Sequence, residues 1–346
     1  MQKRFYFILI TLSIIFFTVS ISPASTVPGN TYQVIDAQNQ TTASAALQVI
    51  GPNLCDSTGA KKQLKGISTH GIQWFPEYIN TDCFRFFRDN WGCNLIRFAM
   101  YTEESGYLSS NEKAVQLKAL IENGVQSCTS LGMYSIIDWH ILSDGNPLSH
   151  VEEAKSFFNG MSALYKDNPY VIYEICNEPN GGTSWNDIKA YAEQVIPVIR
   201  ANAPDAIILV GTPTWSQDVD QAAANPISHE LSHNVMYTLH FYAATHRDDL
   251  RNKLMAARAA GLPVFISEFS TCDASGNGAV DYNSANKWFS LIKENNLSFA
   301  GWNLSNKAES SAILKPGTIS TTGAWTDGDF SETGILLKSL MADENN

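Results

Sequence analysis

The chain has 346 residues, enough for one large α/β barrel of about 250 residues or for two ordinary domains. Apolar residues make up 44% of it, which is sufficient for a sizeable core, and its formal net charge is −11. Such an acidic chain argues against nucleic acid as a partner, because binding to phosphate needs a basic surface.

The N-terminus has the layout of a secretory signal peptide. Lys3 and Arg4 precede an apolar run over residues 5–19, and small residues follow up to position 25. We expect cleavage near Ala24, which removes residues 1–24 and leaves 21 basic against 34 acidic residues, a net charge of −13. The apolar run is short for a membrane span, so an uncleaved anchor is the alternative. The mature protein is expected to be secreted, free of the membrane and monomeric.

The next segment, residues 25–46, is rich in Thr, Ser, Gln, Asn and Ala without an apolar period, so it is expected to form a flexible leader. The fold is expected to start at Leu47. The segments 47–50 and 62–67 flank a cluster of Gly, Pro, Asn and Asp. This pattern predicts a small hairpin that covers the bottom of the structure that follows.

Eight short apolar runs then recur, at intervals close to one βαβ step of about 30 residues or more. The intervals carry helical patterns, such as 112–131, 185–201 and 248–260, with Gly132 and Gly261 just past two helix ends. The repeat predicts an α/β fold, a (β/α)8 TIM barrel over residues 47–342, rather than an open sheet. The expected strands are residues 64–68, 95–100, 134–139, 171–176, 206–210, 235–240, 264–267 and 299–302.

Polar and aromatic side chains stand at the C-terminal ends of these strands, where a (β/α)8 barrel builds its active site. Glu178 follows the fourth strand and Glu268 ends the seventh, so two strands each present one carboxylate and predict a facing pair. Other candidate site residues at the strand ends are His70, Arg97, Tyr101, His140, Asn177, Trp215, His240, Tyr242, Trp302 and Lys307.

A facing pair of carboxyl groups suits the cleavage of a glycosidic bond. One carboxyl group donates a proton to the leaving oxygen and the other attacks the anomeric carbon, and a retaining pair lies about 5 to 5.5 Å apart. We expect Arg97 to keep Glu268 ionised by charge and hydrogen bonding, while Glu178 holds its proton in a more apolar setting. Alternatively, Arg97 pairs with a barrel acid such as Glu174.

The ordered motifs at these strand ends resemble those of glycoside hydrolase family 5, most closely those of bacterial endo-β-1,4-glucanases. The resemblance covers about residues 47–340 and implies a retaining hydrolase with Glu178 as acid/base and Glu268 as nucleophile. The motifs are Asn-Leu-Ile-Arg at 94–97, Ile-Asp-Trp-His at 137–140, Asn-Glu-Pro at 177–179, His-Phe-Tyr at 240–242, Ser-Glu-Phe at 267–269 and Trp-Asn-Leu-Ser-Asn-Lys at 302–307.

The same resemblance implies a set of substrate contacts. Asn177 is similar to the family residue that bonds the sugar 2-hydroxyl, and Tyr242 to the residue that orients the nucleophile. His140 and His240 resemble substrate-site histidines. Trp74, Trp215 and Trp302 resemble sugar-stacking platforms, and Lys307 and Glu309 resemble polar contacts of the donor subsites. Two positions depart from the pattern, Asn306 where Asp is common and Cys272 where a small hydroxyl residue is expected.

Neither a cofactor nor a metal is expected, and the expected partner is a β-glucan polysaccharide. The same chemistry on mannan, xylan, xyloglucan or mixed-linkage glucan remains an alternative, because loop lengths decide the polymer.

A metal-dependent barrel hydrolase would use His70, His140 and His240, but the close His pair expected on the first strand is absent. A non-catalytic carbohydrate-binding barrel would not need both acids. The other histidines, including His246, are expected to be structural.

Six cysteines do not define a disulfide connectivity, because six thiols allow fifteen full pairings. Cys93, Cys176 and Cys272 lie at strand ends and are expected to behave as small buried hydrophobic residues.

Overall fold

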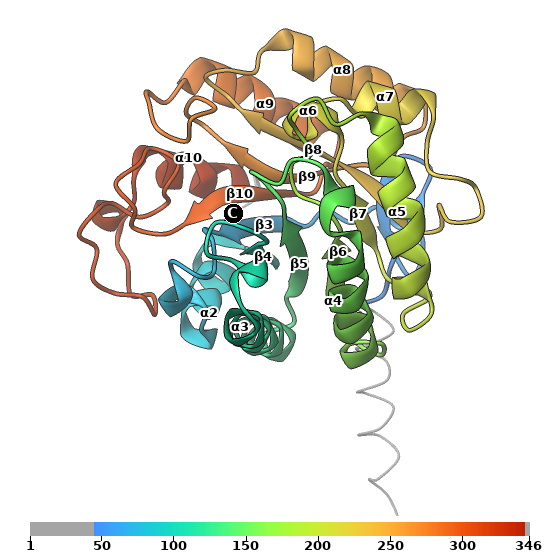
Figure 1. Ribbon diagram of the computed structural model, residues 1–346. Coiled ribbons are helices and arrows are strands. Elements are labelled where there is room, and N and C mark those ends of the chain that lie inside the picture. Colours follow the sequence, from blue (N-terminus) through green and yellow to red (C-terminus); the bar gives the residue numbers. More distant parts are fainter. Residues whose placement is uncertain (1–44, 343–346) are drawn as a thin grey trace, which may run out of the picture. The chain divides into compact units, whose positions relative to one another are not determined.

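The computed structural model describes residues 45–342, so the expected signal peptide and nearly all of the expected leader lie outside the described residues. Eight parallel strands close into a barrel in the order β10-β3-β4-β5-β6-β7-β8-β9, as predicted (Figure 1). The strands are β3 (Lys65–Thr69), β4 (Leu95–Tyr101), β5 (Tyr134–His140), β6 (Val171–Glu174), β7 (Ile208–Val210), β8 (Val235–Tyr242), β9 (Val264–Ser270) and β10 (Phe299–Leu304).

Helices connect successive strands and surround the barrel (Figure 1). The three helices predicted by range agree with the structure to one residue at each end. The helices are α2 (Thr81–Trp91), α3 (Asn111–Ser130), α4 (Val151–Leu164), α5 (Trp185–Arg200), α6 (Pro213–Ser216), α7 (Val219–Ala224), α8 (Asp248–Ala259), α9 (Tyr282–Glu294) and α10 (Glu332–Met341).

The helix ends follow from local sequence chemistry. At the start of α5, the Ser184 side chain accepts a hydrogen bond from the backbone N–H of Asp187, and the Asp187 side chain accepts one from Ser184, which forms a capping box. Just past α3, Gly132 has a φ of +69°, a left-handed conformation that glycine adopts without a steric penalty. These signals explain why the sequence predicts the helix ends well.

The N-terminal hairpin forms, but its second strand is not the one that the sequence predicts. β1 (Leu47–Ile50) pairs antiparallel with β2 (Asn53–Asp56), whereas residues 62–67, the expected partner, lead into β3 of the barrel, which begins at Lys65. Only two residues connect β1 to β2, and Gly51 there has a φ of +55°. A tight turn therefore pairs the nearest segment first.

The hairpin covers the bottom of the barrel, as expected. Leu47 and Leu54 pack in one apolar cluster with Leu95, Ile172 and Phe265 from three barrel strands. The backbone N–H of Val49 also donates a hydrogen bond of 2.9 Å to Oδ1 of Asn234, immediately before β8. The N-terminal ends of the strands are thus closed by the hairpin, and the opposite ends carry the candidate site.

All six cysteines are unpaired and buried, in agreement with the expectation for Cys93, Cys176 and Cys272. Between residues 45 and 342, no helix combines the length and apolar character that crossing a membrane requires.

Candidate active site

The predicted site residues gather in one cleft at the C-terminal ends of the barrel strands. A cavity of about 350 Å³ is adjoined by a second of about 430 Å³, and Glu178, Trp215, Tyr242 and Ala274 line both. The first cavity is also lined by His70, Trp74, Tyr101, His140, Glu268, Trp302, Lys307 and Glu309. The second adds Gln217, His240 and His246. Arg97 and Asn177 are fully buried and lie behind the cleft wall.

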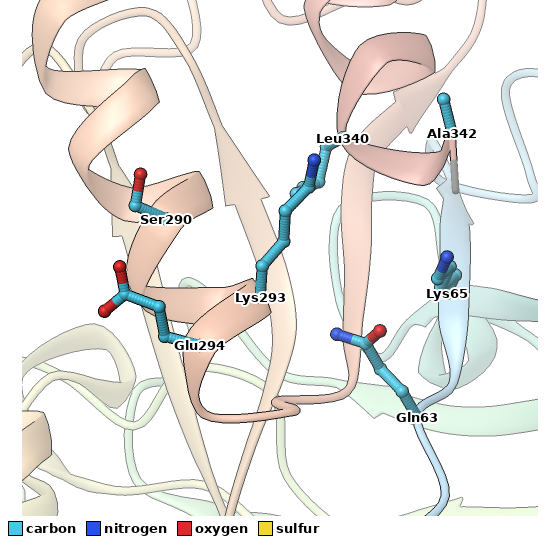
Figure 2. Close-up of a pocket in the computed structure, with 7 residues that line it drawn as sticks. All are labelled: Gln63, Lys65, Ser290, Lys293, Glu294, Leu340 and Ala342. Carbon is cyan, nitrogen blue, oxygen red and sulfur yellow. The ribbon is translucent and has the colours of Figure 1, made fainter. Parts of the chain in front are cut away.

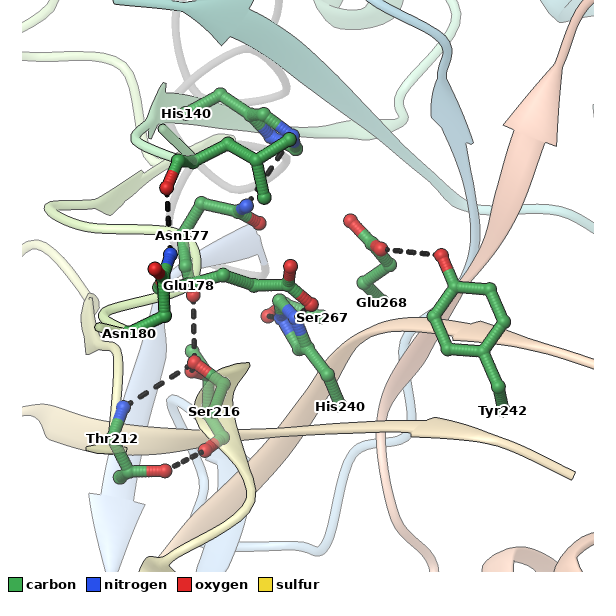
Figure 3. A network of polar contacts seen from close by, with 12 residues as sticks. His140, Asn177, Glu178, Asn180, Thr212, Ser216, His240, Tyr242, Ser267 and Glu268 are labelled. Atoms are coloured by element: carbon green, nitrogen blue, oxygen red, sulfur yellow. Dashed lines mark hydrogen bonds and ion pairs between the residues drawn. The ribbon is translucent and has the colours of Figure 1, made fainter. Parts of the chain in front are cut away.

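Glu178 and Glu268 face each other across the cleft. Glu178 lies just beyond β6, Glu268 belongs to β9, and both side chains are buried. One carboxylate oxygen of each, together with one ring nitrogen of His240, lies within 4.8 Å of the others. Figure 3 shows the two carboxylates with His240 and Tyr242 beside them.

Two donors hold the carboxylate of Glu268. Tyr242 donates a hydrogen bond of 2.9 Å to its Oε1, and Arg97 donates one of 3.2 Å to its Oε2. Burial and the charge of Glu178 nevertheless raise the pKa of Glu268 to about 7, against the opposing effects of His240, Arg97 and Tyr242. This corrects the expectation that Arg97 keeps Glu268 ionised, because its charge lowers the pKa of Glu268 less than burial and Glu178 raise it. Because two close carboxylates resist ionising together, the pair holds one proton in the weakly acidic range.

Arg97 serves both roles that the sequence left open. Its guanidinium donates to Glu174 at 2.7 Å, to Asn177 Oδ1 at 2.6 Å and to Glu268, and lies 2.9 Å from Asp138. Burial alone would lower the pKa of Arg97, but the three surrounding carboxylates raise it, so the guanidinium stays charged. This one cation therefore fixes side chains from β5, β6 and β9 relative to one another.

Glu178 is held by His240. Nδ1 of His240 lies 3.0 Å from Oε1 of Glu178, and its Nε2 lies 2.9 Å from the hydroxyl oxygen of Ser267. Ser267 in turn donates a hydrogen bond of 2.7 Å to Glu174, so its oxygen is free to accept from Nε2–H. Burial disfavours the charged imidazole, but the carboxylate of Glu174, 3.7 Å from Nε2, and the hydrogen bond to Glu178 outweigh it and raise the pKa of His240 to about 9. A proton is thus available on the Glu178–His240 pair.

Glu174 is the buried anion at the end of this chain of contacts. Burial by itself would raise the pKa of Glu174, but Arg97 and His240 lower it to about 2. A permanent negative charge at this point favours a proton on His240, next to Glu178.

His140 and Asn177 form a second fixed pair beside the carboxylates. Nδ1 of His140 lies 2.6 Å from Asp138, and Asn177 Nδ2 lies 3.3 Å from Nε2 of His140. Burial and the charge of Arg97 lower the pKa of His140, so the ring is neutral, donates from Nδ1 and accepts at Nε2. Asn177 Nδ2 also donates to the carbonyl oxygen of Ile141.

The aromatic residues of the cleft differ in exposure. The indoles of Trp74 and Trp215 are 44% and 45% exposed; both line the first cavity, and Trp215 also lines the second. Trp302 is only 6% exposed and stacks on His140, with ring centroids 5.5 Å apart. Trp74 and Trp215 therefore offer free faces, whereas Trp302 forms part of the cleft floor. Trp91, Trp139 and Trp288 are core residues.

A charged cluster lies beside Trp74 in the cleft. Lys307 Nζ lies 2.6 Å from Glu309 Oε2 and 3.2 Å from Nε2 of His70. Burial, followed by the charge of Lys307, lowers the pKa of His70 to about 4, so this ring is neutral at ordinary pH. The cluster can exchange hydrogen bonds with hydroxyl groups of a ligand.

Sequence reasoning missed several functional neighbours. His246, expected to be structural, lines the second cavity and accepts a 2.7 Å hydrogen bond at Nδ1 from the backbone N–H of Tyr242. Gln217, Ala274 and Glu104 also line the cleft. Only its position four residues after Tyr242 could have drawn attention to His246, since a loop beyond a barrel strand borders the site.

A further cavity, of about 490 Å³, lies at the bottom of the barrel, beside the start of β3 (Figure 2). Figure 2 shows Gln63, Lys65, Ser290, Lys293 and Glu294 around it. This cavity contains one carboxylate rather than a pair, so it is not an alternative candidate for the active site.

A histidine metal site is not assembled in residues 45–342. The only group of three or more possible metal ligands found among these residues is Glu178, His240 and Glu268. His140 is instead engaged by Asp138 and Asn177, and His70 by Lys307 and the backbone N–H of Gly71.

A closed (β/α)8 barrel with two facing carboxylates at its C-terminal mouth, flanked by exposed indoles, defines the class as glycoside hydrolase. Comparison with known proteins gives the family. The family described as cellulase (glycosyl hydrolase family 5) matches residues 55–308, so the chain belongs to glycosyl hydrolase family 5.

Individual relatives agree with this assignment. The chain is 47% identical over 344 residues to an endoglucanase of Clostridium saccharobutylicum, covering 99% of this chain and 73% of that protein. It is 47% identical over 285 residues to endoglucanase A of Evansella cellulosilytica, covering 82% of this chain but only 57% of that protein. Among solved structures, cellulase Cel5C_n aligns with a TM-score of 0.83 and 43% identity, covering 88% of this chain and 94% of that one.

Proposed function

We propose that the protein is a retaining endo-β-1,4-glucanase that cleaves internal bonds of cellulose or related β-glucans. The observation that carries the proposal is the approach of Glu178 and Glu268 to within 4.8 Å, each with its own set of partners. Retaining pairs lie about 5 to 5.5 Å apart, whereas inverting pairs need about 6.5 to 9.5 Å to admit a water molecule between acid and substrate.

In this mechanism, Glu178 is the acid/base and Glu268 the nucleophile. Glu268 attacks the anomeric carbon while Glu178 protonates the leaving oxygen, so the glycosidic bond breaks and a glycosyl ester forms. Glu178 then takes a proton from water, which attacks the same carbon and releases Glu268. Arg97 and Tyr242 stabilise the departing carboxylate of Glu268 by hydrogen bonding.

The partners of the two acids favour this assignment of roles over the reverse. Glu268 receives hydrogen bonds from a permanent cation and a phenol, which suit an anion that must form and leave again. Glu178 contacts an ionisable histidine, His240, which suits a group that gives up a proton in the first step and takes one from water in the second. His70, Tyr101, His140, Asn177, Lys307 and Glu309 are proposed substrate contacts or supports of the donor side.

Internal cleavage is supported by the position of the exposed indoles. Trp74 and Trp215 are exposed and line the same cavity as Glu178 and Glu268, and an indole face can cover the apolar face of a pyranose. A glucan chain that contacts both indoles therefore lies in the cavity that contains the two carboxylates. Two relatives are named endoglucanases, which supports a glucan as the substrate.

Secretion and a monomeric state complete the proposal. Lys3, Arg4 and the apolar run at 5–19 support secretion. A polysaccharide is too large to enter a cell, so an enzyme that cleaves it has to be exported.

The test is a product profile of the purified enzyme on carboxymethylcellulose, barley glucan, xylan and mannan. We expect the viscosity of carboxymethylcellulose to fall well before reducing ends accumulate, with the β-anomer released first by NMR. Faster cleavage of mannan or xylan would replace the glucan assignment with the same chemistry on another polymer. An initial α-anomer would contradict the retaining mechanism.

A further inference from the structure

The segment after β7 has an unusual backbone. Thr214, Trp215 and Ser216 have φ values of 58°, 55° and 57°, so three consecutive residues that are not glycine adopt the left-handed conformation. Such residues persist in this conformation only where their surroundings hold them. The turn presents the exposed indole of Trp215 to the cleft.

The hydroxyl group of Ser216 holds this turn from inside the protein (Figure 3). The side chain is fully buried. Its Oγ donates a hydrogen bond of 2.6 Å to the carbonyl oxygen of Asn177 and accepts bonds of 3.3 Å from the N–H of Thr212 and 3.0 Å from the hydroxyl of Thr238. One hydroxyl thus joins β6, the turn and β8.

The two carbonyl groups that accept hydrogen bonds from this turn flank Glu178. Ser216 Oγ bonds the carbonyl of Asn177, immediately before Glu178, and the N–H of Trp215 donates a bond of 3.0 Å to the carbonyl of Pro179, immediately after it. The backbone that carries Trp215 and the backbone that carries Glu178 are therefore fixed to each other on both sides of the acid.

We infer that Ser216 is a positioning residue that couples the Trp215 platform to Glu178 for the protonation of sugar leaving groups. This inference rests on the proposed function. Of the two cavities that Trp215 lines, the one of about 430 Å³ contains Glu178 but not Glu268. It therefore takes the sugar on the leaving side, whose oxygen receives the proton of Glu178. A sugar stacked on Trp215 is aligned with this proton only while the two backbones keep their relative position.

The coupling matters for some leaving groups and not for others. A sugar alkoxide is a poor leaving group, so its departure needs both the stacking on Trp215 and the proton of Glu178. 2,4-Dinitrophenolate leaves without protonation, so cleavage of a dinitrophenyl β-cellobioside depends on Glu268 but not on the alignment that Ser216 maintains. The ratio of kcat/KM for cellotetraose to kcat/KM for this aryl glycoside isolates the role of Ser216, because a general loss of folded enzyme cancels from it.

The test replaces Ser216 by Ala and by Gly. Ser216→Gly removes the hydroxyl and also relieves the left-handed backbone, so it separates the hydrogen bonds from the strain. We expect both variants to lower the ratio about tenfold, the effect of losing one buried hydrogen-bonding group. Thr238→Val removes only the hydrogen bond that Ser216 Oγ accepts from β8, and we expect it to lower the ratio less than the two Ser216 variants do.

Thr214 provides the matched control. It has the same backbone conformation, but its exposed hydroxyl donates to Asp218 and does not reach the Glu178 strand. Thr214→Ala and Thr214→Gly are expected to leave the ratio unchanged. A ratio unchanged in both Ser216 variants, or lowered equally in the Thr214 variants, would overturn the inference. Failure of the wild-type enzyme to cleave either substrate would instead overturn the proposed function.

Discussion

Tyr242 donates a hydrogen bond of 2.9 Å to Oε1 of Glu268, the carboxylate whose pKa is raised to about 7. This bond stabilises the ionised form and lowers the pKa of Glu268, so its removal raises that pKa further. We expect Tyr242→Phe to move the rising limb of the kcat/KM profile to higher pH by about one unit, from the usual strength of a hydrogen bond to a charged group. The measurement is a pH series with dinitrophenyl β-cellobioside.

Tyr237→Phe is the matched control for this change. Tyr237 lies on the same strand, β8, but its hydroxyl accepts a hydrogen bond from the N–H of Ile227, away from the carboxylate pair. We expect its rising limb to coincide with that of the wild type. An unmoved limb in Tyr242→Phe would mean that ionisation of Glu268 does not control the rising limb.

Glu178→Gln is expected to shift the same limb in the opposite direction. The charge of Glu178 is, after burial, the largest cause that raises the pKa of Glu268, and glutamine removes it. The rising limb with the dinitrophenyl substrate should therefore move to lower pH. A shift to higher pH would contradict the coupling between the two carboxylates.

Chemical rescue distinguishes the roles of the two acids. Glu178→Ala lacks the base that deglycosylation needs, so we expect its turnover of an activated cellobioside to be slow and to be restored by azide, which replaces water as the nucleophile. Glu268→Gln cannot form the glycosyl ester, and we expect it to lose roughly 10⁴-fold or more in kcat without rescue of retaining turnover. Near-wild-type activity of Glu268→Gln would contradict the assignment of Glu268 as the nucleophile.

Chelation tests the metal alternative. Glu178 and Glu268 supply the acid and the nucleophile without a Lewis acid, so activity should survive exhaustive EDTA treatment. Because one ligand atom each of Glu178, His240 and Glu268 lies within 4.8 Å of the others, added Zn²⁺ is expected to inhibit by occupying the pair. Loss of activity with EDTA and its recovery with zinc would favour the metal-dependent hydrolase.

Much of the site could be predicted because parallel strands deliver their C-terminal residues to one edge. The apolar runs before Glu178 and Glu268 end at those residues, so strand periodicity places both acids at the barrel mouth. Arg97 lies within such a run, and a buried cation requires anionic partners. Both partners that the sequence suggested, Glu174 and Glu268, contact it.

Other features depend on contacts that the sequence does not contain. The raised pKa of Glu268 follows from its burial and from the position of Glu178, which only the closed barrel determines. The left-handed turn at Thr214, Trp215 and Ser216 has no glycine to mark it. The prediction of the hairpin partner was wrong because a two-residue turn at 51–52 pairs β1 with residues 53–56 and not with 62–67.

Trapping the covalent intermediate tests the central claim most directly. The wild-type enzyme is incubated with 2,4-dinitrophenyl 2-deoxy-2-fluoro-β-cellobioside, whose fluorine slows hydrolysis of the glycosyl ester, and the peptic peptides are analysed by mass spectrometry. The account predicts one fluorocellobiosyl group, attached to Glu268. Attachment to Glu178, or turnover without any covalent adduct, would contradict it.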